Sequence, residues 1–244
     1  FIRLAHQVNI RCIKIGTNYI NQHDDESPNL RITSQIDFSE SILDTKEREI
    51  FLDTLSEFED IFSENPGLTQ VYTHPLYLTD TQPFFHRSYP IPKHMESAVD
   101  AEIDRMLSLG VIERSSSRYI SPMVVVKKRD GSVRLCLDAK FLNNRLLPDH
   151  ERPLTMEQIF QNFKATKLMS TIDLTAAFWH VPLVPEHRQF TGFMHKGEIF
   201  NFKVVPFGLK TSLSALVRML NSIIPQSLKG HLINYVDDLF IHTE

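Results

Sequence analysis

The sequence predicts an α+β fold in which helices and antiparallel hairpins are mixed. Stretches with helical and strand-like patterns follow each other without the strand–helix–strand alternation of a parallel sheet, and no internal repeat is found. The chain has 244 residues, of which 42% are hydrophobic, and this is enough for a sizeable core in one or two domains. We divide it into a region over residues 1–75 and a domain over residues 76–244.

The first region holds one predicted helix. Residues 1–40 are polar, show no clear periodicity and carry no predicted chemistry. A helix begins after Asp44, because Asp44 and Glu47 form a capping-box pattern, and Asn65-Pro66-Gly67 ends it. Its apolar face consists of Ile50, Phe51, Leu55, Phe58, Ile61 and Phe62. The prolines between Thr73 and Pro92 then favour an extended strap over a packed element.

Helices and hairpins follow in turn. Residues 95–109 form a second helix that Gly110 ends, with Val99, Ile103, Met106 and Leu107 on its apolar side. Strands over 123–128 and 132–138 flank Asp130-Gly131, which predicts a type I′ hairpin turn. The remaining elements are a short helix capped by Thr155 and Gln158, a hairpin over 190–202 around Lys196-Gly197, and a helix over 212–224 that Pro225 ends.

The formal net charge of −4 is distributed unevenly. Residues 1–80 carry 14 acidic and 6 basic side chains, whereas residues 81–244 carry 16 acidic and 20 basic ones. The basic excess is greatest over residues 114–145, where eight Lys and Arg face only Asp130 and Asp138. Such a local positive field attracts phosphate backbones and triphosphates. An ordinary solvated charged face is the plainer alternative.

Two adjacent carboxylates interrupt an apolar strand pattern in the segment Tyr235–Asp238. The segment lies between Leu232-Ile233 and Leu239-Phe240-Ile241, and the whole run predicts a β-hairpin with both aspartates at its turn. Like charges side by side repel each other, and a bound cation relieves the repulsion. Mg²⁺, which prefers oxygen ligands, is the natural partner. Asp-Asp is also common in turns, so the pair alone leaves both interpretations open.

A third carboxylate, Asp173, follows the alternating strand pattern of Leu168, Ser170 and Ile172. Small residues come after it, which suits a site where a substrate approaches the backbone closely. Asp173 can equally be the N-cap of a short turn that starts at Thr175.

Four blocks in this order resemble the fingers and palm of reverse transcriptases, especially those of gypsy-type LTR retrotransposons and retroviral pol polyproteins. The blocks are Val133–Asn144, Thr171–Phe178, Val205–Lys210 and Tyr235–Asp238. Phe58–Leu68 and Arg87–Pro92 also resemble the stretch that joins protease to polymerase in those polyproteins. The resemblance implies a right-hand polymerase fold over residues 76–244, with fingers and an antiparallel palm sheet packed by helices, after a linker region over residues 1–75.

The resemblance also implies RNA-directed DNA polymerase activity, which adds dNTPs to a primer 3′-hydroxyl with two Mg²⁺, or with Mn²⁺ as a substitute. The implied catalytic residues are Asp173, Asp237 and Asp238, which with the Leu174 carbonyl are also the implied metal ligands. The implied nucleotide-binding residues are Lys128 (with Lys127 as the alternative), Arg134, Ala177, Phe178 and Phe207. Contacts with an RNA or DNA template and its primer are implied for Asn143, Gly208, Lys210 and Tyr235.

In the family, the arginine at the place of Arg134 contacts the triphosphate, and the aromatic residue at the place of Phe178 is a gate under the sugar. Plainer alternatives exist for each residue. Phe178 and Trp179 can be core residues, Gly208 can be only a turn, and each basic residue can be ordinary surface.

Some positions differ from the family pattern. Where the family has a Pro and then an aromatic-Gln pair, this chain has Leu213 and then Leu216-Val217, and Ala139-Lys140 replaces an aromatic-Arg pair. These differences affect the expected template contacts rather than metal binding. We also expect the thumb, the primer-gripping hairpin and any ribonuclease H domain to lie beyond Glu244, so that the chain is incomplete as an enzyme without those parts of the polyprotein.

Two other classes of function remain open. One is a decayed or domesticated element that binds nucleic acid or a partner without catalysis. The other is a different palm polymerase, such as a viral RNA-copying enzyme, although those usually have Gly before the paired acids, where this chain has Val236.

Composition restricts where the protein acts. Cys12 and Cys136 are too few for a disulfide framework and lack zinc-site spacing, and the 11 histidines show no metal-ligand spacing. The sequence contains no apolar run of membrane length and no signal peptide. We therefore expect a soluble protein without a membrane partner, in the cytoplasm within a virus-like particle, with the nucleus as the alternative.

Overall fold

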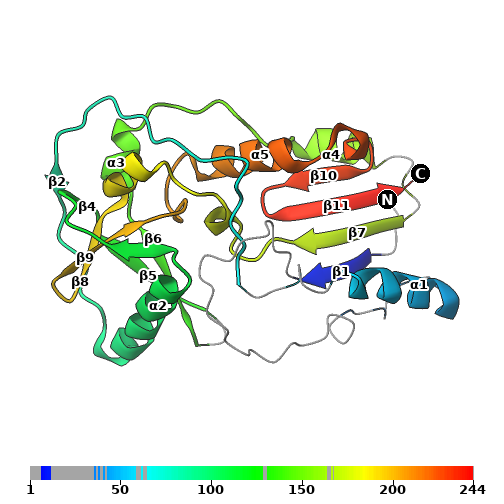
Figure 1. Ribbon diagram of the computed structural model, residues 1–244, viewed down its shortest axis with the longest axis horizontal. Coiled ribbons are helices and arrows are strands. Elements are labelled where there is room, and N and C mark those ends of the chain that lie inside the picture. Colours follow the sequence, from blue (N-terminus) through cyan, green and yellow to red (C-terminus); the bar gives the residue numbers. More distant parts are fainter. Residues whose placement is uncertain are drawn as a thin grey trace.

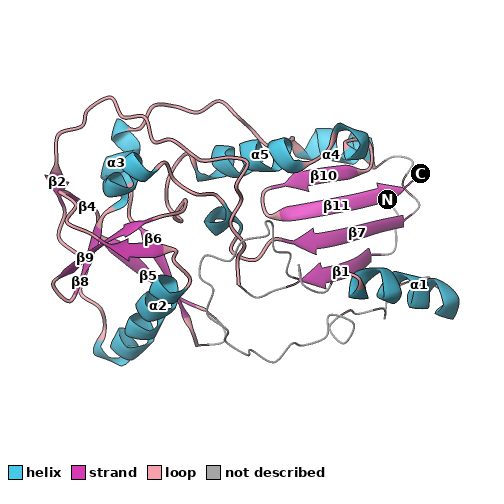
Figure 2. Cartoon of the chain, viewed as in Figure 1, coloured by secondary structure: helices cyan, strands magenta, loops and turns pink. Residues whose placement is uncertain are grey.

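The computed structural model describes residues 7–11, 36, 38, 41, 43–58, 62, 65–128, 131–163, 166 and 168–243. The chain forms two regions that share one hydrophobic core (Figure 1). One region is a four-stranded sheet with helices beside it, and the other contains short sheets of two and three strands with helices between them (Figure 2). The α+β prediction is confirmed. Among the described residues, no helix is both long and apolar enough to span a bilayer.

The four-stranded sheet has the strand order β1-β7-β11-β10. Its strands are β1 (Gln7–Arg11), β7 (Leu168–Asp173), β10 (Leu232–Tyr235) and β11 (Asp238–Thr243). Strand β11 runs antiparallel to β7 and β10, as predicted, but β1 is parallel to β7. The predicted antiparallel sheet is confirmed for β7, β10 and β11. Strand β1 adds a parallel strand from residues 1–40, where we find no clear periodicity in the sequence. The polar–apolar alternation from Gln7 to Arg11 is the signal that indicates this strand.

Helices α4 (Met156–Asn162) and α5 (Ser212–Ile223) run alongside β10 in the view of Figure 1. Helix α5 is the more deeply packed of the two, because seven of its residues are buried: Ser212, Ser214, Ala215, Leu216, Val217, Met219 and Leu220. Helix α4 begins with the predicted capping box of Thr155 and Gln158. Just after α4, Phe163 meets Phe240 of β11 edge-on, with ring centroids 5.9 Å apart.

Helix α1 (Thr45–Ser56) begins with the predicted capping box, in which Asp44 Oδ1 accepts a bond from Glu47 N at 2.8 Å. The helix ends at Ser56, well before Asn65, so its predicted length is wrong. Ile50 and Phe58 are 58% and 51% exposed, whereas Phe51, Leu55 and Phe62 pack against the core and Ile61 lies outside the described residues. An exposed apolar face does not stabilise further turns, because helices in proteins depend mainly on packing.

In the second region, the 3₁₀ turn η3 (Lys93–Met95) leads into α2 (Glu96–Ser108), which buries Val99, Ile103 and Met106. Gly110, with φ +65°, follows the helix end as predicted. The three-stranded sheet contains β3 (Ile112–Arg114), β8 (Phe193–His195) and β9 (Glu198–Phe202), and the short sheets pair β2 (Phe84–Phe85) with β4 (Tyr119–Ile120) and β5 (Met123–Lys127) with β6 (Val133–Leu137). The remaining elements are α3 (Lys140–Arg145) and the 3₁₀ turns η4 (Ala177–His180), η5 (Pro185–Thr191) and η6 (Gln226–Leu228).

The two predicted hairpin turns differ in outcome. Lys196 and Gly197 both have positive φ, as a type I′ turn between β8 and β9 requires, so the predicted hairpin around them is confirmed. Its predicted start at residue 190 is wrong, because Phe190 and Thr191 belong to η5 and the first strand begins at Phe193. In the β5–β6 hairpin, Lys128 N bonds to Ser132 O at 2.8 Å, which leaves three residues between the two instead of two. Gly131, with φ +89°, is the left-handed residue that closes a three-residue loop, and Asp130 lies outside the described residues.

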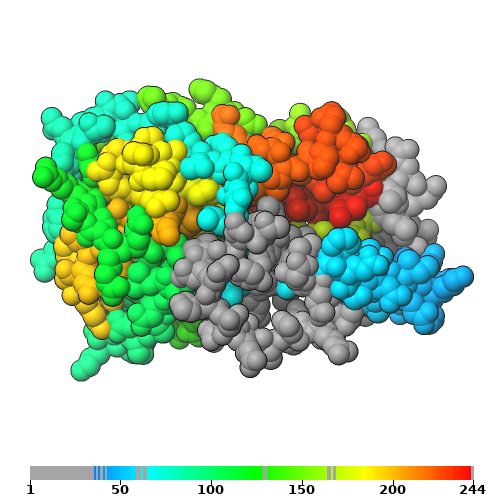
Figure 3. All heavy atoms as spheres, viewed as in Figure 1, coloured from blue at the N-terminus to red at the C-terminus, as the bar shows by residue number. Residues whose placement is uncertain are grey.

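An extended strap over residues 65–92 connects the two regions, and its cyan atoms lie at the surface in Figure 3. Its backbone bonds to both regions: Thr69 N donates to His180 O at 2.9 Å, and His86 N donates to Ile120 O at 2.8 Å. The predicted strap between Thr73 and Pro92 is confirmed, with only the two-residue strand β2 within it.

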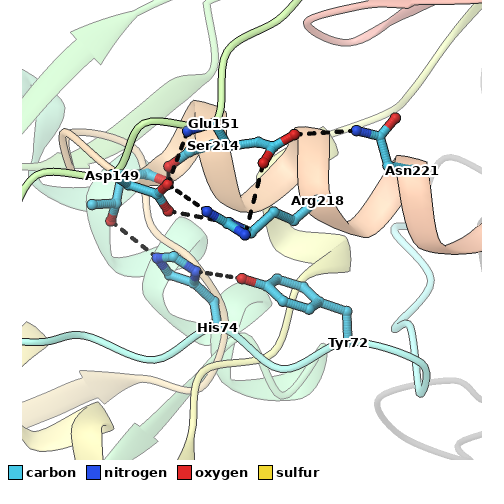
Figure 4. Close-up of polar contacts among 8 residues, drawn as sticks. Tyr72, His74, Asp149, Glu151, Ser214, Arg218 and Asn221 are labelled. Carbon is cyan, nitrogen blue, oxygen red and sulfur yellow. Dashed lines mark hydrogen bonds and ion pairs between the residues drawn. The ribbon is translucent and has the colours of Figure 1, made fainter.

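Figure 4 shows the polar network that fixes this strap against α5. The ring of His74 bonds to Tyr72 Oη at 2.9 Å and to Thr211 Oγ1 at 3.1 Å. Close by, Arg218 of α5 donates to Asp149 Oδ1 at 2.8 Å, and its hydrogen bonds lower the pKa of Asp149 to about 2. His74 is buried, and burial lowers the pKa of its ring to about 4, so the ring is neutral at pH 7.

This burial predicts a specific pH dependence of stability. Because the folded pKa of His74 lies below the unfolded value of 6.5, the unfolded chain binds more protons between pH 6.5 and about 4, and stability is lost as the pH falls through that window. His74→Gln should remove a loss of roughly 2–3 kcal/mol between pH 7 and pH 4. Urea unfolding at several pH values measures this, and equal pH slopes for both proteins would contradict it.

Candidate functional site

The end of the four-stranded sheet brings three carboxylates together. Asp173 is the last residue of β7, Asp238 is the first residue of β11, and the two are direct partners in the antiparallel register. Facing residues of such a pair lie on the same side of a sheet. Asp237 precedes Asp238 in the turn, and its carbonyl accepts a hydrogen bond from Leu174 N at 2.9 Å. The structure thus pairs Asp173 with Asp238, 65 positions later in the sequence.

The predicted hairpin is confirmed, with one difference in its tip. Tyr235 pairs with Asp238, so only Val236 and Asp237 form the turn, and Asp238 belongs to the strand. Val236 has φ +56°, which is costly for a β-branched residue and is typical of strained functional turns. The 3₁₀ turn η4 has Ala176 as its N-cap and no side-chain capping bond, so Asp173 does not cap η4.

The electrostatics of this site favour a bound cation. The pKa of Asp238 is raised, first by burial and then by the negative charges of Asp237 and Asp173. A hard divalent cation would relieve that repulsion, and carboxylate oxygens are the ligands that such ions prefer. The described side chains alone do not form a finished cage, since no group of three or more His, Cys, Asp or Glu among them is arranged to hold a metal ion. The donor chemistry fits, and the three aspartates and the Leu174 carbonyl are the residues that could supply it.

An aromatic cluster with one cation follows the carboxylates in the chain. Phe178 of η4 and Phe207 meet edge to face, with ring centroids 5.4 Å apart and an interplanar angle of 73°. The guanidinium carbon of Arg134, on β6, lies 5.1 Å from the Phe207 centroid. Trp179 is buried, as the core interpretation predicts, whereas Phe178 is only partly buried and Arg134 is exposed. Three predicted nucleotide-binding residues are therefore in contact.

Asn143 and the segment from Gly208 to Lys210 form a second group. The Asn143 side chain donates to Gly208 O at 2.8 Å and accepts from Lys210 N at 2.8 Å. Gly208 has φ +107°, and a Cβ on it would lie 2.1 Å from the Leu137 carbonyl oxygen. Only glycine fits there, so the residue has a structural role in addition to any contact with template. The contacts of Asn143 with the backbone are a role that sequence reasoning does not reveal.

The other predicted site residues are placed less tightly. Lys128 is exposed at the end of the β5–β6 hairpin, Ala177 is buried in η4, and Tyr235 is partly buried at the end of β10. At the positions that differ from the family pattern, Ala139, Leu216 and Val217 are buried in the core and Leu213 is partly buried. In this chain these residues contribute packing.

Comparisons with known proteins relate this chain to one family. The family described as reverse transcriptase (RNA-dependent DNA polymerase) matches residues 126–244. The Pol polyprotein of transposon 297 from Drosophila melanogaster is 30% identical over 218 residues, covering 85% of this chain and 21% of the polyprotein. That of transposon gypsy is 27% identical over 217 residues, with the same two coverages. The chain thus spans about a fifth of the length of these relatives.

A solved structure has the same fold. The foamy viral protease–reverse transcriptase in complex with RNA/DNA hybrid matches with a TM-score of 0.71 and 24% identity, covering 83% of this chain and 28% of that one. The predicted reverse transcriptase fold of fingers and palm is confirmed. Members of this family generally use a divalent metal ion.

The repulsion among the carboxylates gives a prediction that needs no enzyme assay. Asp238→Asn removes one of three neighbouring negative charges, so it should raise the melting temperature in EDTA by about 2–4 °C, the change that ~1 kcal/mol gives in a chain of this size. Mg²⁺ should then stabilise the original protein more than the variant. Calorimetry with and without Mg²⁺ measures both effects. Asp104→Asn, an exposed change on α2, is the matched control and should alter neither; an equal Mg²⁺ response in all three proteins would contradict the prediction.

Proposed function

The chain carries a reverse transcriptase domain of the kind found in LTR-retrotransposon Pol polyproteins, and from this premise we propose that it forms the fingers and palm of an RNA-directed DNA polymerase. This enzyme would add dNTPs to a primer 3′-hydroxyl. The observation that carries the proposal is the register of Asp173 with Asp238 beside Asp237, at the end of a sheet that leads directly into the cluster of Phe178, Phe207 and Arg134.

The carboxylates supply negative charge and the fingers supply positive charge. Asp173, Asp237, Asp238 and the Leu174 carbonyl would hold two Mg²⁺, or Mn²⁺ in their place. The ions would acidify the primer hydroxyl and offset the charge of the departing pyrophosphate. Arg134 and Lys128 would bind the triphosphate with fixed positive charges. Positioning and electrostatics account for most of the barrier reduction in phosphoryl transfer, so no side chain is needed as a dedicated base.

The nucleotide would lie between Arg134 and the acids. Ala177 and Phe207 would border it, and the ring of Phe178 would lie under the sugar. In this arrangement the partly buried state of Phe178 supports a gate, because a ring that is fully enclosed in the core has no surface to offer a substrate.

The nucleic-acid partner would be a primer on an RNA or DNA template. The foamy viral neighbour is in complex with RNA/DNA hybrid, and a duplex in the same place would lie near Asn143, Gly208, Lys210 and Tyr235. The eight Lys and Arg over residues 114–145 would attract its phosphates. Base pairing would select the sequence, while the protein holds the duplex by its backbone and shape.

Binding without catalysis is the second candidate. It is favoured by the lack of a finished three-ligand cluster among the described residues and by the packing role of Leu216 and Val217. One experiment separates the two functions. Residues 1–244 are joined to the thumb of a related element, and the chimaera is tested for Mg²⁺- or Mn²⁺-dependent dNTP extension of a DNA primer on RNA. Duplex binding without extension would support the second candidate.

The same chimaera tests the metal ligands. Asp237→Asn removes a charge but keeps the turn propensity of the residue, so it should abolish extension, with a loss of at least about 100-fold, while the melting temperature does not fall. Rates and circular dichroism are measured in parallel. If the variant retained most of its activity with a normal fold, Asp237 would be a turn residue and not a ligand.

The sugar gate has its own test. A rigid ring under the 2′-carbon excludes a ribose hydroxyl by overlap, so Phe178→Val should increase rNTP use relative to dNTP use, by roughly tenfold or more, while the metal ligands stay in place. Incorporation of paired dNTP and rNTP substrates measures the ratio. If Phe178 is a core residue instead, the substitution leaves a cavity that destabilises the fold by about 2–4 kcal/mol. The melting temperature would then fall while the discrimination between rNTP and dNTP stayed unchanged.

A further inference from the structure

Phe207 occupies the centre of the aromatic cluster. The Arg134 guanidinium lies over its ring at 5.1 Å, Phe178 meets it edge to face at 5.4 Å, and Trp179 lies at 6.1 Å. Arg134 comes from the β5–β6 hairpin and Phe178 from the turn that follows the palm strand β7. One ring thus touches the cation proposed for the triphosphate and the ring proposed for the sugar.

The backbone holds Phe207 firmly on both sides. Its carbonyl accepts a hydrogen bond from Leu137 N at 3.1 Å, which attaches it to the end of β6. The next residue, Gly208, lies so close to the Leu137 carbonyl that no Cβ fits, and Asn143 bonds to the Gly208 carbonyl at 2.8 Å. The backbone from which the Phe207 side chain extends is therefore fixed.

The orientation of the exposed Arg134 side chain depends on this ring. Among the residues that the structure describes, the side chain of Arg134 has no hydrogen-bonding or ion-pair partner, so the face of Phe207 is the contact that orients its guanidinium. The negative face of an aromatic ring attracts a guanidinium that lies over it. In an edge-to-face pair, the positive edge of one ring points at the negative face of the other. Both contacts with Phe207 are directional, and they share the same ring.

We propose that Phe207 is a positioning residue that fixes the guanidinium of Arg134 and the ring of Phe178 relative to each other, and so couples triphosphate binding to sugar selection. The inference deepens the proposed function and rests on it. A substrate that displaces the guanidinium from the ring changes the packing of the same ring against Phe178. A side chain without an aromatic face loosens both neighbours at once, even though it is apolar and of similar size.

The test uses the 244-residue chain itself. Phe207→Leu removes the aromatic face, and Phe207→Tyr keeps it. The control is Phe38→Leu, because Phe38 is in a similar arrangement elsewhere: the Arg48 guanidinium lies 5.4 Å from its centroid and Phe51 meets it at 6.0 Å and 83°. Calorimetric titration with dATP and with ATP, both in Mg²⁺, gives the affinity and the sugar preference. The NMR shift of the Arg134 Nε–H reports its position over the ring without any nucleotide.

The expected result is a joint loss. Phe207→Leu should weaken dATP binding and reduce the dATP-to-ATP preference by about threefold or more each, and the ring-current shift of Arg134 should disappear. Phe207→Tyr keeps the aromatic face and should keep the ring-current shift of Arg134, and Phe38→Leu should change none of the three. A change in only one of affinity and preference, or an equal effect of Phe38→Leu, would overturn the inference. An unchanged Arg134 shift in Phe207→Leu would refute the positioning role by itself, since that readout needs no nucleotide, whereas the proposed function is decided by primer extension in the chimaera.

Discussion

Repulsion between carboxylates that face each other across two strands is the constraint on which this structure depends. Asp173 and Asp238 are partners in the β7–β11 register, and like charges in that position destabilise a sheet. The register persists because Leu239 lies opposite Ile172 on the buried face, and a shift by one residue would expose both. The apolar side of the sheet thus holds the charges together on the other side. In the proposed function, a bound divalent cation would offset this local loss of stability.

The sheet needs support from segments that are distant in sequence. His74 in the strap and Thr211 before α5 share a buried hydrogen bond, and α5 in turn covers the core with apolar residues. His74 satisfies both ring nitrogens while it stays neutral, so the strap is fixed without burying a charge. Residues 208–210 come directly before Thr211 in the chain. The Asn143 side chain bonds to the backbone of both Gly208 and Lys210 and so fixes this segment. The placement of the proposed substrate groups therefore rests on satisfied polar contacts.

The positions that depart from the reverse transcriptase pattern also avoid burying unpaired polar groups. Leu216 and Val217 are buried on α5, and Ala139 is buried where β6 leads into α3. Apolar side chains at these places replace possible polar contacts with packing, which keeps the core dense without leaving unpaired polar groups. The departures are compatible with a stable fingers-and-palm fold.

The sequence by itself determined the local elements. The capping boxes at Asp44 and Thr155 and the Lys196-Gly197 turn form as their residues predict, because each signal involves contacts within a few residues. The ordered blocks also identified the family and the three aspartates. Where the signal was weak, as at the end of α1 and in the loop before Ser132, the prediction failed, since packing and hairpin register decide those points.

Only the tertiary structure decided how distant segments meet. The parallel pairing of β1 with β7, the register of Asp173 with Asp238, and the position of Arg134 over Phe207 all join residues far apart in the chain. No local pattern encodes such contacts, because side-chain periodicity specifies which face of an element is buried and not which element covers it. The sequence could name the residues of the site, and the sheet register and the shared core brought them together.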